Sequence, residues 1–284
     1  MTYPRLCRNF GRINETIQMN DKRLTLEEAV RLVKPGDMFA PGGMTLYRRP
    51  LAFIKALLRR YQQTGEPDQL TLMAFTAGLE SDLLVGAGMI SKVRSCYFGL
   101  EIFGLAPMFT YFSNRGELEI IEETEASLSF GLRAAMSGLN FLPGRGWIGT
   151  DLPKLRPDVR IILDPYSDEE LMAFPAIKPD VAVIHALRAD PEGNALIGKN
   201  KGIDIELSGT AATVIVTAEE IVPALDEADV IAPWVDAVVH APLGAAPTSC
   251  HPLYGLDGEM LLDYSEQVND PLSWKTFMTQ WIAE

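Results

Sequence analysis

The sequence is poor in the side chains that most often hold metal ions. It has three cysteines and three histidines among 284 residues, and no CxxC motif. Cys7, Cys96 and Cys250 are odd in number and far apart, which is typical of reduced thiols in a cytoplasmic protein rather than of a disulfide framework. The histidines are too scattered for the ligand spacing of a metal site. We therefore expect no metal.

Basic residues and long apolar stretches are also scarce. Lysine and arginine number 25 against 38 acidic residues, which gives a net charge of −13. This balance argues against nucleic acid or an anionic membrane as a partner, because both attract basic surfaces, whereas a local basic site for a small anion stays possible. The sequence has no apolar run of 18 residues, and its first residues lack the apolar core of a signal peptide. It thus predicts a cytoplasmic protein without a membrane span.

Apolar residues make up 47% of the chain, enough for a large core. The run 181–187 is apolar on both faces, as in a central strand of a sheet that is covered on both sides. Similar runs at 212–216 and 235–240 alternate with helical patterns, which indicates an α/β fold with a mainly parallel sheet and helices on both faces. Residues 1–24 are polar and unpatterned, so we interpret them as an N-terminal arm on a single domain of residues 25–284.

Local signals mark further segments. Asp270 followed by Pro271 predicts the start of a C-terminal helix. Residues 141–157 are rich in Gly and Pro and are expected to form a long loop with a functional or interface role. Acidic residues near helix ends, Asp82 and Glu123 among them, are expected to be solvated.

A glycine pair lies between a predicted strand and a predicted helix. The strand ends at Ala40, Gly42 and Gly43 follow, and the helix begins after Pro50. Glycines here allow a positive φ and the close approach of a ligand, and the helix start would offer free N–H groups to an anion or an oxyanion. Taken alone, the stretch is more simply interpreted as a plain connection, because short motifs often match by chance.

Two glycine-containing patterns look like nucleotide sites but lack the required context. Gly144–Gly149 reads GxGxxG, yet a predicted helix rather than a strand precedes it. Gly193–Asn200 differs from a P-loop at Asn200, which replaces the hydroxyl that would hold Mg²⁺. We therefore predict neither a dinucleotide site nor a nucleotide triphosphatase.

Glu101 follows a predicted strand that ends at Gly99, within the apolar stretch 98–107. The carboxyl ends of parallel strands face the ligand crevice of open α/β sheets. Apolar neighbours should partly desolvate this carboxylate and raise its pKa, which is a property of many catalytic carboxylates. An exposed and inert loop glutamate is an equally good interpretation.

Two more loops follow predicted strand ends. The segment 188–194 contains turn signals and includes Asn194, and a tight turn is its simpler interpretation. The segment 241–249 contains Gly244 and Thr248, whose small size suits the close approach of a ligand or of another subunit.

Together these segments resemble the alpha subunit of family I CoA-transferases of the glutaconate CoA-transferase type. The matching blocks lie between residues 26 and 265 and are Gly42-Gly43 with Pro50, 179–185, 188–190 with Gly193-Asn194, 217–221, 235–239, and Gly244 with 247–250. The family signature reads Gly-Gly-Phe, three residues, Gly, one residue, Pro. Here Met44 replaces the Phe and Arg48 replaces the later Gly, which favours a pocket for a charged or unusual acyl group.

The resemblance implies a reaction and a partner. In this family a Glu attacks an acyl-CoA thioester to give an anhydride and then an enzyme–CoA thioester, and in two-subunit members this Glu belongs to the beta subunit. The resemblance therefore implies a hetero-oligomer that moves CoA between carboxylic acids, with coenzyme A as a substrate and no cofactor. The residues to which it assigns substrate contacts are Gly42, Gly43, Met44, Arg48, Gly99, Asn194, Gly244 and Thr248.

Two alternatives stay open. One branch of the relatives hydrolytically opens a ring in a steroid-derived CoA thioester, lacks the beta-subunit nucleophile, and uses an alpha-subunit Glu in a similar setting as acid or base. This resemblance makes Glu101 the candidate catalytic residue. Related folds also serve as non-catalytic sugar-phosphate sensors, but these usually carry a DNA-binding head, for which residues 1–24 are too short.

Overall fold

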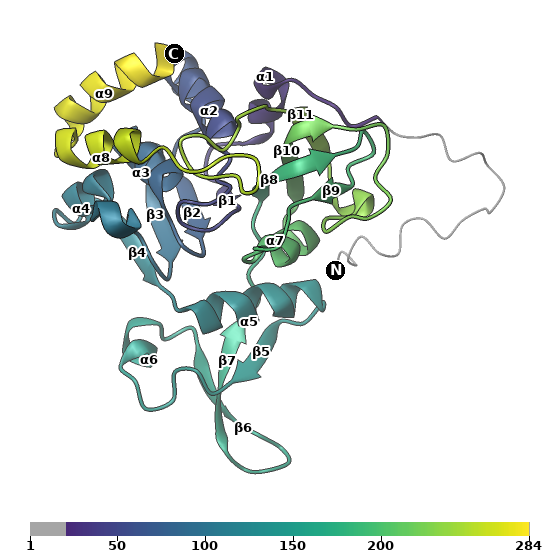
Figure 1. The fold of residues 1–284 in the computed structure, drawn as a ribbon. Helices are drawn as coiled ribbons and strands as arrows, with labels where there is room; N and C mark the ends of the chain where they lie inside the picture. Colours follow the sequence, from purple (N-terminus) through teal and green to yellow (C-terminus); the bar gives the residue numbers. More distant parts are fainter. Residues whose placement is uncertain (1–20, 284) are drawn as a thin grey trace.

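A mainly parallel sheet forms the body of the protein (Figure 1). The computed structural model describes residues 21–283, so most of the predicted N-terminal arm lies outside the described residues. Within them, the sheet has eight strands in the order β11-β10-β8-β1-β2-β3-β4, with β9 antiparallel to β8. The strands are β1 (Met38–Pro41), β2 (Leu70–Ala74), β3 (Ile90–Ser95), β4 (Glu119–Glu122), β8 (Val181–Ala189), β9 (Ala195–Leu196), β10 (Thr213–Ile221) and β11 (Ala237–His240).

Helices cover both faces of this sheet, as the sequence predicts. Along β8, Val181 and Val183 join one core cluster, whereas Ala182 and Ile184 join the other. The first cluster lies against α2, α3, α8 and α9, and the second against α5 and α7. The helices of the main body are α1 (Leu26–Ala29), α2 (Leu51–Thr64), α3 (Leu79–Gly86), α4 (Pro107–Ser113), α5 (Glu125–Met136), α7 (Asp204–Thr210), α8 (Gly258–Gln267) and α9 (Pro271–Ala283), with 3-10 turns η2 (Val30–Leu32), η3 (Glu101–Phe103) and η4 (Ala232–Trp234).

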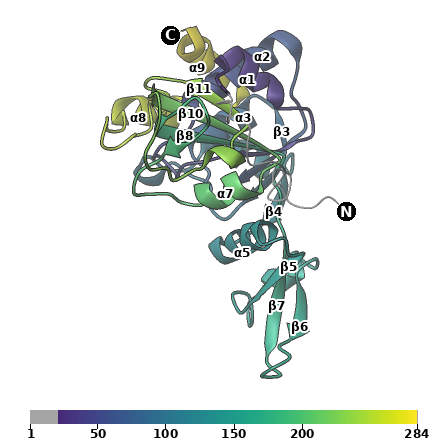
Figure 2. The same cartoon turned by 90° about the vertical axis from the view of Figure 1, so that its right-hand side faces the viewer.

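A small second sheet projects beyond α5 (Figure 2). It is antiparallel, in the order β5-β7-β6, where β5 is Phe141–Gly144, β6 is Arg160–Leu163 and β7 is Glu170–Pro175. Trp147 and Phe174 contact each other edge to face in a core of its own. The prediction of one long loop over 141–157 is therefore wrong, because pairing with β7 overrides the low strand propensity of Gly and Pro.

The same sheet corrects the reason for rejecting a dinucleotide site at Gly144–Gly149. A strand, β5, does precede this motif. However, β5 pairs antiparallel with β7, and the helix that follows, α6 (Leu152–Leu155), has only four residues. The motif therefore does not open a βαβ unit, which the dinucleotide fingerprint requires.

The described end of the arm joins the main sheet beside β11. Leu24 N–H donates to Val238 O (2.8 Å), and Val238 N–H donates to Lys22 O (2.9 Å).

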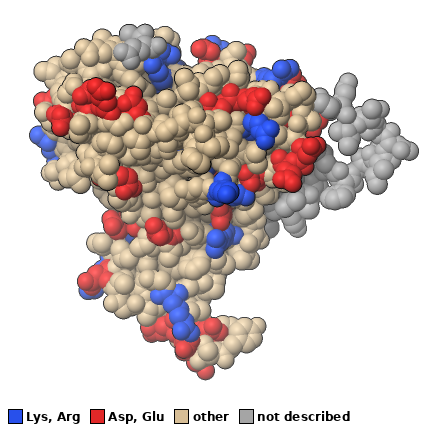
Figure 3. Space-filling view, in the orientation of Figure 1, with Lys and Arg blue, Asp and Glu red and all other residues tan. Residues whose placement is uncertain are grey.

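No helix among residues 21–283 is long and apolar enough to cross a membrane. Figure 3 shows acidic groups spread over one face of the molecule, with basic groups in small separate places.

Two carboxylates that were expected to be solvated are buried. Asp82 on α3 accepts hydrogen bonds from the Tyr264 hydroxyl (2.7 Å) and from the N–H groups of Met108 and Phe109 (3.1 and 2.7 Å), so it caps α4. Glu123 is held by two arginines. All these partners are distant in the chain, which is why local sequence signals do not reveal the burial. Burial raises the pKa of Asp82 to about 6, although its hydrogen bonds oppose this shift.

Replacing Tyr264 with Phe should destabilise the protein more at pH 8 than at pH 5. At pH 8 Asp82 is ionised and loses a hydroxyl donor, and a hydrogen bond to a charged group contributes about 1.5–3 kcal/mol. At pH 5, below the raised pKa of about 6, the carboxyl is mostly protonated in the folded state, so the loss is smaller. Denaturant unfolding at both pH values measures the difference. Tyr61→Phe is the control, and an equal loss at both pH values would contradict this role of Asp82.

Candidate functional site

The glycine loop, residues 42–49, begins where β1 ends, and its glycines serve contacts inside the protein. Gly42 N–H donates to Val183 O (2.8 Å), and Gly43 N–H donates to Asp204 Oδ1 (3.0 Å). A Cβ on Gly42 would lie 2.7 Å from Asp204 Oδ1, and Gly43 has a φ of +81°. Both N–H groups are therefore used before any ligand arrives.

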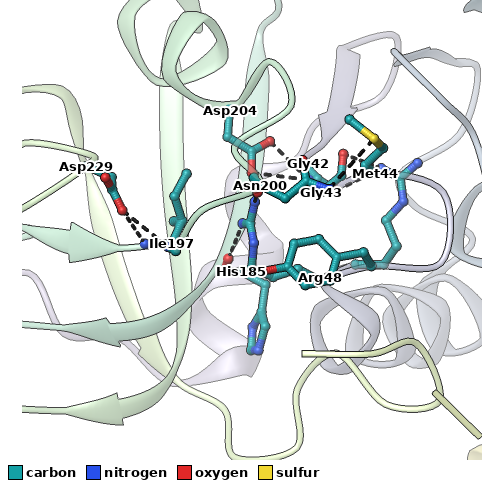
Figure 4. Close-up of polar contacts among 12 residues, drawn as sticks. Gly42, Gly43, Met44, Arg48, His185, Ile197, Asn200, Asp204 and Asp229 are labelled. Atoms are coloured by element: carbon teal, nitrogen blue, oxygen red, sulfur yellow. Dashed lines mark hydrogen bonds and ion pairs between the residues drawn. The ribbon is translucent and has the colours of Figure 1, made fainter. Parts of the chain in front are cut away.

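Arg48 is buried, with 1% of its side chain exposed, and connects the glycine loop to two other elements (Figure 4). Its Nη2 lies 2.6 Å from Asp204 Oδ2 on α7 and donates to Asn200 O (3.1 Å). Its Nη1 donates to His185 O on β8 (2.5 Å). The guanidinium thus holds the loop from inside the protein and is closed to solvent. The resemblance led us to expect Arg48 at an open pocket, and its side chain does not lie at one.

The backbone of Arg48 explains the departure from the family signature. Its φ is +55°, in the left-handed region that favours Gly. The loop therefore requires a positive φ at the position where the signature has Gly. An Arg takes this conformation here, and the ion pair and hydrogen bonds of its side chain offset the backbone strain.

Arg49 anchors the glycine loop from the other side. Its Nη1 donates to Gly42 O (2.8 Å) and its Nε to Thr45 O (3.1 Å). Its Nε also lies 3.2 Å from Glu80 Oε2, and neither side chain of this ion pair is exposed. Sequence reasoning missed this pair, although two adjacent arginines in an apolar stretch are a signal that could have found it.

The loop after β11, residues 241–254, packs along the glycine loop. Ser249 N–H donates to Leu46 O (3.0 Å), and Arg48 N–H donates to Ser249 O (2.6 Å). Since β1 and β11 are separated by β8 and β10 in the sheet, this loop brings distant strand ends together at one edge.

The predicted contact residues of the later loops fall into two groups. Gly244 and Thr248 do reach the glycine loop region: Gly244 O accepts from Ala52 N–H (2.9 Å), and Thr248 Oγ1 accepts from Arg49 N–H (3.3 Å). Because Ala52 N–H is used, the start of α2 offers fewer free donors than expected. Asn194 lies elsewhere, where its side chain closes the turn after β8.

Met44 forms the half-exposed side of the glycine loop, next to residues 198–202. The side-chain amide of Asn200 lies 3.9 Å from Met44 Sδ. Lys201 pairs with Asp229 (2.5 Å). The other carboxylate oxygen of Asp229 accepts from the N–H groups of Ile197 and Gly198, where this segment begins. The segment is thus fixed beside Met44 and carries positive charge in an acidic protein.

Glu101 is exposed, so the expected partial burial is wrong, and the alternative of an exposed loop glutamate describes its position. It begins η3 and has a φ of +55°. Its apolar neighbours Ile102 and Leu105 are themselves 92% and 72% exposed, so they do not bury the carboxylate. Gly99, two residues earlier, is buried. Within residues 21–283, the Glu101 side chain has no hydrogen bond or ion pair.

A polar network that sequence reasoning missed lies behind the 241–254 loop. His185 Nε2 is 2.7 Å from Glu219 Oε1, and His185 Nδ1 is 2.8 Å from Thr217 Oγ1. Burial lowers the pKa of His185, against the influence of Glu219. Burial acts to raise the pKa of Glu219, but hydrogen bonds from His185 and Tyr254 outweigh it and hold this pKa below its ordinary value. A neutral imidazole therefore donates through Nε2–H to an ionised carboxylate and accepts from Thr217 at Nδ1.

The network also gathers potential metal ligands. The ligand atoms of His185, Glu219 and Cys250 lie within 4.8 Å of one another, although the three residues are far apart in the sequence. The nitrogens and the carboxylate already bond to each other and to neighbours. Burial raises the pKa of the Cys250 thiol to about 11, which disfavours the thiolate that a metal would need. The cluster is better explained as a hydrogen-bonded part of the core.

A family model described as Coenzyme A transferase matches residues 23–241. The match includes the main sheet and the glycine loop. The chain therefore belongs to the coenzyme A transferase family.

Named relatives align along nearly the whole chain. The A subunit of the 3-oxoadipate CoA-transferase of Pseudomonas knackmussii is 36% identical and aligns over 92% of this chain and 92% of its own length. The cholesterol ring-cleaving hydrolase IpdA subunit of Rhodococcus jostii is 30% identical, over 94% of each chain. An uncharacterized protein of Archaeoglobus fulgidus is 37% identical, but this chain spans 58% of its length.

Solved structures support the same assignment. Glutaconate coenzyme A-transferase from Acidaminococcus fermentans superposes with a TM-score of 0.84 at 29% identity, over 92% of this chain and 88% of that one. A variant of the decarboxylase AibA/AibB gives 0.83 at 30% identity, over 92% and 100%. Together with the named relatives, these matches identify the chain as a family I CoA-transferase alpha subunit.

Removing the Asp204 carboxylate should destabilise the protein strongly. Asp204→Ala leaves the Arg48 charge buried without its partner, which typically costs about 3–5 kcal/mol. Asp204→Asn should cost less, because it keeps an acceptor for Gly43 N–H. The control is Glu206→Ala on the same helix, whose partner Arg133 is 60% exposed, so the loss should stay below about 1 kcal/mol. Denaturant unfolding measures all three, and equal losses for Asp204→Ala and Glu206→Ala would contradict the importance of the buried pair.

Proposed function

We propose that this alpha subunit works with a beta subunit to move coenzyme A between carboxylic acids. The relatives named as the A subunits of 3-oxoadipate and glutaconate CoA-transferases support this, since they align with 92% and 93% of the chain. The observation that carries the proposal is that Asp204 and Glu80 are fully buried in pairs with Arg48 and Arg49. A nucleophile must reach an acyl carbonyl, so the carboxylates that hold the glycine loop are unavailable for attack. This agrees with an attacking glutamate that the partner supplies.

In this mechanism the partner's glutamate attacks the thioester carbonyl and expels the CoA thiolate, which leaves a mixed anhydride. The thiolate then attacks the glutamyl carbonyl, so that the first carboxylate departs and a glutamyl–CoA thioester remains. The acceptor carboxylate reverses the two steps. The role of this chain is to shape the acyl pocket with Gly43, Met44 and the 198–202 segment, and the rigid glycine loop limits the entropy lost on binding.

Chemical trapping tests where the covalent intermediate forms. The complex of this chain with its co-purified partner is incubated with the CoA thioester of a dicarboxylic acid and then reduced with borohydride, which converts a glutamyl thioester into an alcohol. We expect the mass change on a glutamate of the partner and none on this chain. A sample without acyl-CoA is the control, and a modified glutamate on this chain would overturn the proposed division of roles.

Hydrolysis is the second candidate activity, because Glu101 is exposed and unpaired within residues 21–283. Its left-handed backbone adds a strain of the kind that gathers at functional positions. The relative named as a cholesterol ring-cleaving hydrolase subunit aligns with 94% of this chain. In this case Glu101 would act as a general base that activates water.

Glu101→Ala in the assembled complex separates the two activities. If Glu101 is a general base, hydrolysis of the acyl-CoA should fall by roughly 10²–10⁴-fold, whereas transfer, which uses the partner's glutamate, should fall by much less. Rates of CoA release and of CoA transfer to an acceptor acid measure the two effects. Glu117→Ala, in the exposed turn before β4, is the matched control. An unchanged hydrolysis rate would exclude Glu101 as the base.

A further inference from the structure

Glu219, near the end of β10, binds donors from three other places in the chain. His185 on β8 reaches Glu219 Oε1 (2.7 Å). Leu243 N–H donates to Oε2 (2.6 Å), Gly244 N–H donates to Oε1 (3.2 Å), and the Tyr254 hydroxyl donates to Oε1 as well. Only 8% of the Glu219 side chain is exposed. This carboxylate therefore holds both ends of the 241–254 loop.

The start of the loop has an unfavourable backbone shape, which the carboxylate stabilises. Leu243 is 65% exposed and has a φ of +53°, which is unfavourable for a residue with a Cβ. Next to it, a Cβ on Gly244 would lie 2.6 Å from His185 Cε1. The Leu243 and Gly244 N–H groups point at the Glu219 carboxylate in this conformation, so the carboxylate selects the turn that they form.

The 241–254 loop in turn holds the glycine loop. Ser249 exchanges backbone hydrogen bonds with Leu46 and Arg48 (3.0 and 2.6 Å). Thr248 Oγ1 accepts from Arg49 N–H (3.3 Å). A continuous set of hydrogen bonds thus runs from Glu219 through the 241–254 loop to the glycine loop.

We propose that Glu219 is a positioning residue, which fixes the 241–254 loop and through it the shape of the glycine loop that faces the acyl group. Both of its carboxylate oxygens accept from donors of the protein itself, so it acts through the loop. The proposal rests on the proposed function for the identity of the pocket, but not for the ordering of the loop. A carboxylate suits the role because it accepts only, whereas an amide would place its NH₂ group against a donor such as Leu243 N–H. The lowered pKa of Glu219 agrees with an ionised group at neutral pH.

Glu219→Gln tests the proposal, with Glu220→Gln as the matched control. Glu220 is the next residue of β10 and is exposed. Hydrogen exchange of residues 241–254, measured in the full chain with and without its partner, should be faster in Glu219→Gln by about 10-fold or more, because a hydrogen bond to a charged group is lost. Glu220→Gln should exchange like the wild type. This readout stays valid even if the complex proves to have no transferase activity.

Kinetics and a second variant distinguish positioning from general loss of stability. In the assembled complex, Glu219→Gln should raise KM for the acyl-CoA while exchange in the distant small sheet stays unchanged. Tyr254→Phe removes one donor and keeps the carboxylate. It should therefore also make hydrogen exchange of residues 241–254 faster, but by a smaller factor than Glu219→Gln does. Expressed as a free energy, the increase in exchange of residues 241–254 in the double variant should not exceed the sum of the increases in the two single variants, because both changes act on one network. Equal exchange of 241–254 in Glu219→Gln and Glu220→Gln, or faster exchange throughout the chain, would overturn the proposal.

Discussion

The buried ion pair between Arg48 and Asp204 is the interaction on which the candidate site depends. Taking both charges out of water is unfavourable, and their mutual attraction offsets this only when the remaining donors and acceptors are also paired. Here the carbonyls of His185 and Asn200 accept from the two Nη groups of the guanidinium, and Gly43 N–H donates to the carboxylate. Among the described residues only the Arg48 Nε–H of this group is left without an acceptor. The pair therefore forms only when the end of β1, β8 and the start of α7 lie next to one another. It thus couples the shape of the glycine loop to the packing of these three elements.

This constraint separates the supporting groups from the reacting groups. The buried ion pairs of the glycine loop join Arg48 to Asp204 and Arg49 to Glu80, and all four side chains are used in holding the loop. An exposed carboxylate such as Glu101, or one supplied by a partner, remains free for chemistry. A loop held rigidly by paired charges would suit the proposed function, in which this chain provides shape and another chain provides the nucleophile. Such a loop would be compatible with more than one reaction on a CoA thioester.

Sequence reasoning predicted the features that depend on local pattern. Runs that are apolar on both faces, such as 181–187, predicted the central parallel strands. Asp270-Pro271 predicted the start of α9. Features that depend on distant contacts were missed. The small sheet needs β7 to pair with a Pro- and Gly-containing segment, and Asp82 is buried because Tyr264 and the start of α4 fold over it. The apolar neighbours of Glu101 suggested burial, but hydrophobic residues at a turn can themselves be exposed, and only the fold shows which.

Arg48 shows how a signature residue can be misinterpreted in two ways. A Gly in a family pattern is easily assigned to ligand access, and its replacement by Arg is then taken as a change of specificity. The left-handed φ of Arg48 gives a different cause: the loop needs this backbone conformation, and Gly provides it without strain. Where Arg provides it, the side chain must turn inward to be stabilised, and the Asp204 carboxylate is placed to receive it. The charge introduced at this position is thereby neutralised inside the protein. Under the proposed function, acyl specificity would therefore be sought at Met44 and the 198–202 segment beside it.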